Sequence, residues 1–397
     1  MLAIPSFDRA SIVLWLRCLA GRYAVLFAER HGLYLYTDPA GTMGIYHTAS
    51  AAASTPSLLV AAQTEPPELP WLSECQNHFF PGKTCCHPEV HPLMANHELH
   101  LNTGTSIRFW LPLAPSEESL ANVEKICTLL QQIVKGISAA GPLLASLSGG
   151  RDSRVILAAL RAFAQDVRFF TIEASRVGGE RDLKFSRELA ARFQLNHQIF
   201  RSGPTLDWLS SAYDEIGAGM CSARHRRELD GVQQVDAAGC THLGGFGGEV
   251  LRAELWPSAR PTRADTRILA RQAFPRPSNM VTASIDEWRR SVPPGTSPAT
   301  VFDLFEFEQR AGRTAGINEA CSGIFYETAL PFASRELFEL LQGIPCAMRY
   351  GRSVNAALIQ MMWPELLEVP FTDSGRQVWK CLPKSLRMVA RGLLRVR

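Results

Sequence analysis

The sequence contains no uninterrupted run of 18 apolar residues, so a membrane-spanning helix is not expected. Its apolar first segment is broken by a proline and by charged residues, which also disfavours a secretory signal peptide. The ten cysteines, from Cys18 to Cys381, form no CxxC pair, which disfavours a zinc site or a disulfide framework and favours reduced thiols. A formal net charge of +3 is too small to indicate a nucleic-acid partner. We therefore expect a cytoplasmic protein without a transmembrane segment and without a nucleic-acid partner.

The composition is that of a folded, globular protein. The chain has 397 residues, of which 46% are hydrophobic and 20% charged, and this length suffices for two domains with separate cores. Runs of β-branched and aromatic residues at 23–28, 32–37 and 98–110 predict strands, and the segment Asp38–Gly41 predicts a turn. Residues 1–112 are therefore expected to form an antiparallel, β-rich N-terminal domain.

A linker is predicted at residues 113–119, where proline and small polar residues interrupt the apolar pattern. Ser116 is the expected N-cap of the next helix, whose apolar residues recur at helical spacing: Leu120, Val123, Cys127, Leu130, Val134 and Ile137. From residue 143 onward, short apolar runs alternate with helical patterns, which predicts parallel strands joined by helices. Residues 120–397 are thus predicted as an α/β domain with a doubly wound parallel sheet, and residues 250–310 as its helical cap.

One segment carries a recognisable chemical signal, and it lies between a predicted strand and a predicted helix: Ser148-Gly149-Gly150-Arg151-Asp152-Ser153. The two glycines allow the backbone to approach a bulky anion, and the N-terminus of the helix directs amide groups and a positive dipole end toward it. The two serines add hydroxyl groups, and the carboxylate of Asp152 offers a hard oxygen ligand for Mg²⁺. Together these features predict a site for the pyrophosphate group of a nucleotide.

The segment resembles the phosphate loop of SGGxDS-type ATP pyrophosphatases, and the chain is most similar to the asparagine synthetase family among them. Further along, Glu180, Asp182 and His197 follow in the order that this family shows. The segments Gly244–Val250 and Glu327–Phe332 resemble its second glycine-rich loop and its E-A-R-V-P-F segment. The likeness extends over residues 20–375.

This resemblance implies an adenine nucleotide alpha hydrolase-like fold and a ligase that uses ATP and Mg²⁺. Such an enzyme activates a carboxylate as an acyl-adenylate, releases pyrophosphate, and forms an amide when ammonia or an amine displaces AMP. Its partners are a small-molecule or peptide carboxylate and the nitrogen nucleophile. The implied ATP-binding residues are Ser148, Gly149, Gly150, Asp152, Ser153, Gly245, Gly247 and Gly248. The implied metal ligands are Asp152 and Glu249, and the implied catalytic residue is Glu327.

Residues 1–112 resemble the glutamine-hydrolysing domain of the same family, for example in YTDPAGTMGIYH at residues 36–47. That domain uses a cysteine at its mature N-terminus, and the free amine of this cysteine serves as the base. The present chain begins with Met1-Leu2, and its first cysteine, Cys18, lies in an apolar helical pattern. We therefore expect a degenerate amidotransferase-like domain without glutaminase activity.

Three positions depart from the family pattern. The second loop lacks an aspartate beside Glu249, Ala329 replaces an arginine, and Glu368 replaces a lysine before the segment Pro370–Asp373. These departures keep two alternatives open. One is a peptide or natural-product cyclase that resembles lasso-peptide or β-lactam synthetases, and the other is a non-catalytic, nucleotide-binding partner protein. RNA thiolation also uses such loops, but it would require a broad basic face and a paired catalytic cysteine.

Other charged groups are less informative. Arg224–Arg227 fits a site for an anionic substrate and a solvated surface equally well. His197, at the start of a predicted strand, is interpreted as a structural residue. Basic residues from Lys380 to Arg395 recur at helical spacing, which predicts a C-terminal helix, most simply one packed on its own domain. The sequence is compatible with a homodimer and does not identify the substrate.

Overall fold

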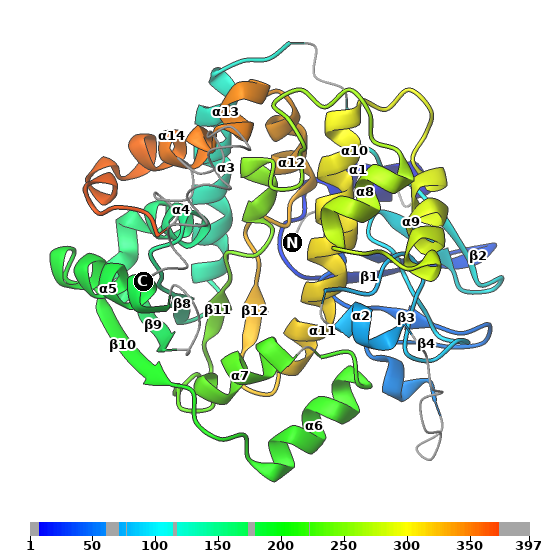
Figure 1. Ribbon diagram of the computed structural model, residues 1–397, viewed down its shortest axis with the longest axis horizontal. Coiled ribbons are helices and arrows are strands. Elements are labelled where there is room, and N and C mark those ends of the chain that lie inside the picture. Colours follow the sequence, from blue (N-terminus) through cyan, green and yellow to red (C-terminus); the bar gives the residue numbers. More distant parts are fainter. Residues whose placement is uncertain are drawn as a thin grey trace, which may run out of the picture.

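A computed structural model describes residues 8–60, 71–76, 78–113, 117–173, 179–221 and 223–372 (Figure 1). The strands of the first part of the chain form two antiparallel sheets, and the later strands form one parallel sheet. The prediction of an antiparallel N-terminal sheet and a parallel C-terminal sheet is therefore confirmed. The predicted linker at 113–119 includes residues 114–116, and the predicted C-terminal helix begins after residue 372, so both fall at least partly outside the described residues.

The N-terminal part contains a four-stranded sheet in the order β1-β2-β6-β7 and a three-stranded sheet in the order β4-β3-β5. Ile12 and Leu16 of the first helix pack on one face of the larger sheet, against Phe27 and Tyr36. Successive side chains of a strand point to opposite faces of the sheet, so every second residue faces the helix. The elements are α1 (Arg9–Cys18), β1 (Ala24–Glu29), β2 (Gly32–Thr37), β3 (Tyr46–His47), β4 (Ala52–Ala53), a 3₁₀ helix (Pro56–Leu58), α2 (Leu72–Gln76), β5 (His91–Pro92), β6 (His97–His100) and β7 (Thr105–Arg108).

The parallel sheet has five strands in the order β10-β9-β8-β11-β12, and every neighbouring pair is parallel. The chain starts in the middle strand β8, moves outward to β9 and β10, and then returns to the other side of β8. The order therefore reverses between β8 and β11, which is where a crevice opens in sheets of this type. The strands are β8 (Leu143–Ser146), β9 (Arg168–Glu173), β10 (Asn196–Arg201), β11 (Thr241–Leu243) and β12 (Glu327–Ala329).

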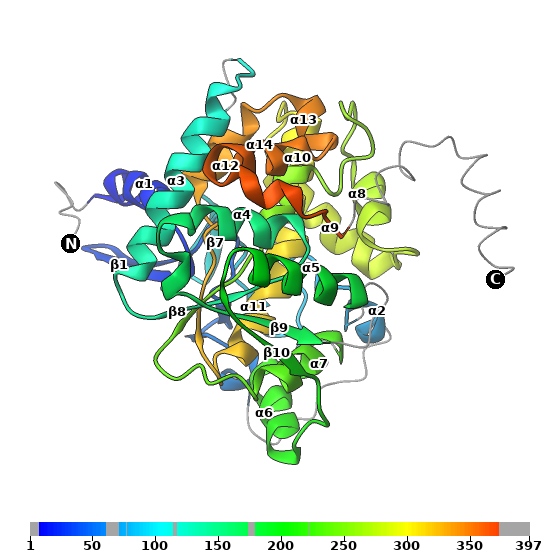
Figure 2. The ribbon, with the colours of Figure 1, turned by 90° about the vertical axis from the view of Figure 1, so that its left-hand side faces the viewer.

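Helices cover both sides of this sheet, with α3, α4 and α14 on one side and α6 and α7 on the other (Figure 2). Within α3 the predicted apolar spacing is confirmed, because Val123, Cys127, Leu130 and Val134 are buried. The helix begins only at Ala121, and the predicted N-cap Ser116 lies outside the described residues. The helices are α3 (Ala121–Ser138), α4 (Arg151–Ala159), a 3₁₀ helix (Arg161–Asp166), α5 (Gly179–Arg192), α6 (Asp207–Gly217) and α7 (Ala223–Val232).

The helices predicted at residues 250–310 are present, and the last part of this helical region is a continuous rod between the parallel sheet and the N-terminal part (Figure 1). The middle of this rod is a π-helix, an uncommon conformation that is frequent at functional sites. Gly312 follows it, and a Cβ atom there would lie 1.8 Å from the carbonyl oxygen of Ala40, so the two parts of the chain are in close contact. The cap contains a 3₁₀ helix (η3, Gly248–Arg252), α8 (Thr266–Ala273), α9 (Asn279–Ser291), α10 (Pro298–Leu304), the π-helix η4 (Phe305–Ala311) and α11 (Gly312–Ser322).

After β12 the chain returns to the side of α3 and α4. The remaining elements are α12 (Arg335–Gln342), α13 (Cys346–Tyr350), α14 (Ser353–Met362) and a 3₁₀ helix (Pro364–Glu368). Helix α14 contacts both α3 and α4, so the end of the described chain lies against the helix that follows the first glycine-rich segment. Across the described part of the chain, no helix combines the length and the hydrophobicity needed to cross a bilayer.

Candidate nucleotide-binding site

Two glycine-rich loops from neighbouring strands meet at one place. The first follows β8 and leads into α4, and the second follows β11 and leads into η3. A Cβ atom added at Gly248 would lie 2.8 Å from the Cβ and Cγ atoms of Asp152, and one at Gly245 would lie 3.3 Å from the backbone nitrogen of Ser153. Side chains at these two positions would therefore push the loops apart. The structure brings both sets of predicted ATP-binding residues together, although they are about 100 positions apart in sequence.

The first loop is also closed off by the end of the described chain. A Cβ atom at Gly149 would lie 2.6 Å from Cγ2 of Thr372 and 2.9 Å from Cβ of Phe185. The backbone nitrogen of Thr372 donates to the carbonyl oxygen of Gly149 at 3.0 Å. The segment predicted from its likeness to the family's last motif therefore lies against the loop. Glu368, at the lysine position of that motif, is half-exposed and pairs instead with Arg192.

The serines of the loop bind each other. The hydroxyl oxygens of Ser148 and Ser153 are 2.7 Å apart, and that of Ser148 also accepts from the backbone nitrogen of Gly150 at 3.1 Å. Gly150 is the N-cap of α4, so the positive end of this helix points at the loop. The loop thus leads into the N-terminus of a helix, a backbone arrangement that favours an anion.

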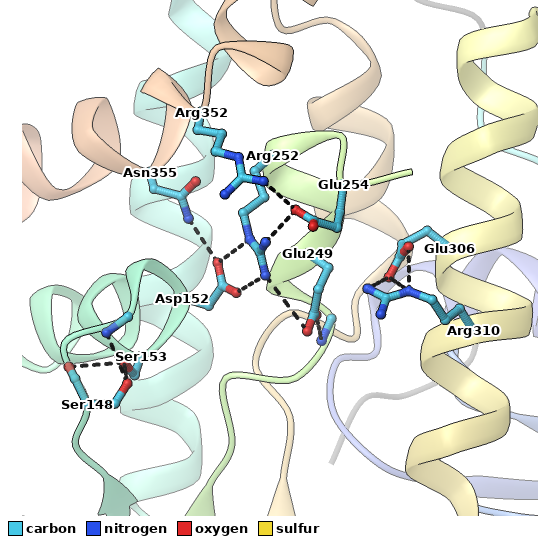
Figure 3. Close-up of polar contacts among 12 residues, drawn as sticks. Ser148, Asp152, Ser153, Glu249, Arg252, Glu254, Glu306, Arg310, Arg352 and Asn355 are labelled. Atoms are coloured by element: carbon cyan, nitrogen blue, oxygen red, sulfur yellow. Dashed lines mark hydrogen bonds and ion pairs between the residues drawn. The ribbon is translucent and has the colours of Figure 1, made fainter. Parts of the chain in front are cut away.

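A network of carboxylates and guanidinium groups surrounds Asp152 (Figure 3). The Nη2 atom of Arg252 lies 3.0 Å from Oδ2 of Asp152 and 4.0 Å from Oε1 of Glu249. The same arginine donates through Nη1 to Glu254 at 2.6 Å, and Asn355 donates to Oδ1 of Asp152 at 3.1 Å. Burial raises the pKa of Asp152 above its ordinary value, and the charge of Arg252 opposes this shift. The carboxylate of Asp152 is therefore held by the protein itself.

This arrangement does not fit the expected metal site. A divalent ion bound by Asp152 and Glu249 would have to displace the guanidinium group of Arg252, which contacts both carboxylates. Oε2 of Glu249 additionally accepts from the backbone nitrogen of Gly247 at 3.0 Å. Across the ranges that the structure describes, no group of three or more His, Cys, Asp or Glu side chains is arranged to hold a metal ion.

A cavity of about 1000 Å³ extends from the two loops along the sheet toward α7 and α11. Ser148, Gly245 and Glu249 line it, whereas Asp152 and Gly248 do not. The other predicted ATP-binding residues, Gly149, Gly150, Ser153 and Gly247, also lie outside the lining. The cavity is large enough for a nucleotide and a second substrate.

Acidic side chains dominate the charged lining of this cavity. Two arginines, Arg227 and Arg310, accompany six acids: Asp182, Glu228, Glu249, Glu254, Glu306 and Glu319. Glu306 and Arg310 pair with each other on η4 at 2.8 Å, and burial raises the pKa of Glu306 although Arg310 opposes this. The Oε2 atom of Glu319 is buried and has no hydrogen-bond partner among the described residues. Glu228 and Glu319 were not predicted, because they come from α7 and α11 and belong to no local motif.

A match to a known protein family covers the first glycine loop of this site. Residues 125–228 match the family model of asparagine synthase. This asparagine synthase segment includes β8, the first glycine loop, β9, β10 and much of α7, and the family consists of ATP-utilising ligases. No curated protein matches the chain significantly.

A solved enzyme structure matches part of this chain. An NH3-dependent NAD synthetase from Campylobacter jejuni, in complex with a nitrate ion, matches with 16% identity over 47% of this chain and 92% of its own. Its TM-score is 0.23, which is too low to establish a common fold. The likeness of this chain to known ligases therefore depends on the asparagine synthase segment and on the two loops.

The predicted catalytic residue Glu327 lies beyond the asparagine synthase segment and is not brought to the loops. It is exposed at the amino end of β12, paired with Thr241, and it does not line the cavity. The loops follow the carboxyl ends of β8 and β11, which is the opposite edge of a parallel sheet. Among the other residues weighed from the sequence, His225 and Arg227 line the cavity, and His197 bonds Thr171 at 2.8 Å.

Proposed function

We propose that this protein is an ATP-dependent carbon-nitrogen ligase of the asparagine synthase type. It activates a carboxylate as its acyl-adenylate, releases pyrophosphate, and forms an amide when a nitrogen nucleophile displaces AMP. The observation that carries the proposal is the meeting of two glycine loops at the strand-order reversal between β8 and β11, next to a cavity. The match of residues 125–228 to the asparagine synthase family supports it.

The residues around the cavity suit the parts of a nucleotide. The positive end of α4 and the hydroxyl of Ser148 would stabilise the negative charge that develops on the leaving pyrophosphate. Leu147, Phe170 and Ile172 provide an apolar wall at the carboxyl ends of β8 and β9, against which the base would pack. We route no step through a metal ion held by Asp152 and Glu249, because Arg252 bridges them.

ATP-pyrophosphate exchange with pooled carboxylates tests this function. We expect Ser148→Ala to lower exchange roughly tenfold, because it removes a hydroxyl at the loop. Ser138→Ala is the matched control, since the Ser138 hydroxyl donates to the carbonyl oxygen of Lys135 in its own helix, at the end of α3, and its removal should not change exchange. Nucleotide binding without any pyrophosphate release would instead support a non-catalytic partner protein.

A specific observation favours the second candidate, a cyclase or peptide-type ligase whose nucleophile is an amine. Glu319 presents a buried carboxylate oxygen without a hydrogen-bond partner in the described chain, and Glu228 lies on the same wall. Such carboxylates attract an ammonium group and repel the two carboxylates of a substrate with a net negative charge, such as aspartate. We expect Glu319→Gln to raise KM for an amine-bearing substrate and to leave exchange unchanged. Turnover of aspartate with ammonia at full rate would contradict the amine nucleophile.

We further propose that the nitrogen does not come from glutamine hydrolysed in the N-terminal part. Cys18 is exposed at the last turn of α1, and its thiol donates to the carbonyl oxygen of Leu14 at 3.8 Å. Cys18→Ala should therefore leave amine-dependent activity intact. A glutaminase activity that disappears in this variant would contradict the proposal.

A further inference from the structure

The guanidinium group of Arg252 is located where a cation would be expected to join the two glycine loops. It contacts Asp152 of the first loop and Glu249 of the second, at 3.0 and 4.0 Å. Both members of the closer pair are largely buried, since the exposed fractions of the Arg252 and Asp152 side chains are 18% and 16%. A buried carboxylate needs a compensating charge, and here a side chain of the protein supplies it.

The surrounding contacts fix Arg252 in this position. Its second nitrogen donates to Glu254 at 2.6 Å, and Arg352 donates to the same carboxylate oxygen at 2.9 Å. Asn355 of α14 holds the other oxygen of Asp152, and the approach of Gly248 leaves that carboxylate little room to turn. Arg252 is therefore part of a chain of charged pairs that continues from the first loop to α14 (Figure 3).

The balance of charges around Asp152 also indicates that Arg252 occupies the place of a cation. Asp152, Glu249 and Glu254 carry three negative charges, and Arg252 and Arg352 carry two positive charges within hydrogen-bond or ion-pair distance of them. An additional divalent ion would reverse the balance and would lie against a guanidinium group, where like charges repel. A free metal site would require Arg252 to leave its three carboxylate partners.

We propose that Arg252 takes the place of a protein-bound divalent cation between Asp152 and Glu249, so that this protein binds ATP without a metal ion held by its two loops. The inference depends on the proposed function, because it concerns how the ATP site is neutralised. It makes Arg252 a positioning residue that joins the two loops, since it does not itself line the cavity.

Measurements on the wild-type protein come first. ATP binding is measured by calorimetry with Mg²⁺ and with EDTA, and binding of Mn²⁺ alone is measured by electron paramagnetic resonance. We expect the two ATP affinities to agree within about threefold. We expect Mn²⁺ binding of the wild type to equal that of Asp152→Asn, because Asp152 holds no ion.

Arg252→Gln removes the charge and keeps much of the side-chain length. ATP affinity in EDTA should fall roughly tenfold or more, because the loops then carry uncompensated negative charge. Mg²⁺ should restore this affinity, and a new Mn²⁺ site should appear that is lost in the double variant with Asp152→Asn. Arg263→Gln is the matched control, since Arg263 pairs with Asp265 on the surface and does not line the cavity; it should change none of these values.

Several results would overturn the inference. Asp152-dependent Mn²⁺ binding by the wild type would show that the carboxylates hold a metal in spite of Arg252. An unchanged ATP affinity of Arg252→Gln in EDTA would show that its charge is irrelevant. ATP binding by the wild type only with Mg²⁺ would refute this inference and leave the proposed function standing, whereas no ATP binding in either solution would refute both.

Discussion

Individual glycines determine whether the two loops can meet. Gly248 faces Asp152 so closely that a Cβ atom would lie 2.8 Å from two of its atoms, and neither of them is the end of a flexible side chain. The contact is therefore rigid, and the position of the Asp152 carboxylate depends on the absence of a side chain at residue 248. Motifs of this kind can be recognised from sequence, because glycine is required by the backbone and not by a distant partner.

The first prediction concerns this contact. Gly248→Ala should displace Asp152, break its pairing with Arg252 and weaken ATP binding roughly tenfold or more. Calorimetric titration with ATP measures the effect. Gly136→Ala is the control: this glycine lies within α3 with nothing within 4 Å of an added Cβ atom, so the change should stabilise the protein by up to about 1 kcal/mol. Equal ATP affinities of the two variants would argue against a functional contact.

The sequence predicts helices and strands most accurately where apolar residues recur at a regular spacing over many positions, or where a recognisable loop motif follows them. The strand predicted at 32–37 coincides with β2, and the burial of α3 follows the predicted spacing. Such patterns do not predict where α3 begins or at which end of its strand Glu327 lies. A short strand such as β12 does not reveal in its own sequence which end faces the loops, because the direction is set by its neighbour β11.

Arg252 shows the same limit at the site. Its position three residues after Glu249 gives no sign that it reaches Asp152, which is 100 residues earlier in the chain. The contact exists because β8 and β11 are adjacent, and this adjacency is a property of the whole sheet. The sequence therefore predicts the two loops, whereas the pairing of Arg252 with Asp152 is visible only in the structure.

The second prediction concerns the segment after α14 that closes the first loop. Arg154 of α4 is fully buried and donates to the carbonyl oxygens of Gly149, Leu366, Val369 and Pro370. Arg154→Ala should remove this donor from the carbonyl oxygens of Leu366, Val369 and Pro370, whereas Gly149 keeps its bond from Thr372, and should destabilise the protein by about 2–4 kcal/mol. Hydrogen exchange measured by mass spectrometry should accelerate at residues 366–372 and at the loop.

Arg161→Ala provides the control for this segment. Arg161 is half-exposed and donates to the carbonyl oxygen of Met362, so its removal should change stability by less than about 1 kcal/mol. If both variants exchanged equally slowly at residues 366–372, Arg154 would not be what holds the segment in place.

At the scale of the whole molecule, a buried ion pair connects the N-terminal part to the helical rod. Arg108 of β7 forms two bonds with Glu308 of η4, at 2.6 and 2.7 Å, and the exposed fractions of the two side chains are 7% and 0%. Trp288 and Asn96 also donate to this carboxylate, each at 2.9 Å. Burial alone would raise the pKa of Glu308, but the charge of Arg108 and these bonds hold it below its usual range.

The third prediction follows from this pair. Arg108→Ala leaves a buried carboxylate without its charge partner and should lower the free energy of unfolding by about 3–5 kcal/mol. Arg290→Ala removes the partner of Asp286 on the surface of α9, where the arginine side chain is 72% exposed, and should cost less than about 0.5 kcal/mol. Urea denaturation measures both, and similar losses would contradict the structural importance of the buried pair.

The fourth prediction is the pH dependence of folding. Burial lowers the pKa of His97, His197 and His242 to about 4, whereas an unfolded histidine titrates near 6.5. Between these values the unfolded chain binds protons that the folded chain does not, so the free energy of unfolding should fall as the pH falls from about 6.5 to about 4. Glu308, whose folded pKa is lowered, adds a further loss of stability when the pH falls below the range of ordinary carboxylates.

Urea denaturation at pH 7, 6 and 5 measures the slope of this curve, where each buried histidine contributes at most about 1.4 kcal/mol per pH unit. His242→Gln should reduce the slope by about one proton, because one of the three buried histidines no longer titrates in the unfolded chain. His31→Gln, in the exposed turn between β1 and β2, is the control and should leave the slope unchanged. A slope that did not respond to His242→Gln, while His31→Gln altered it, would place the titrating groups at the surface and contradict the burial of His242 beside the cavity.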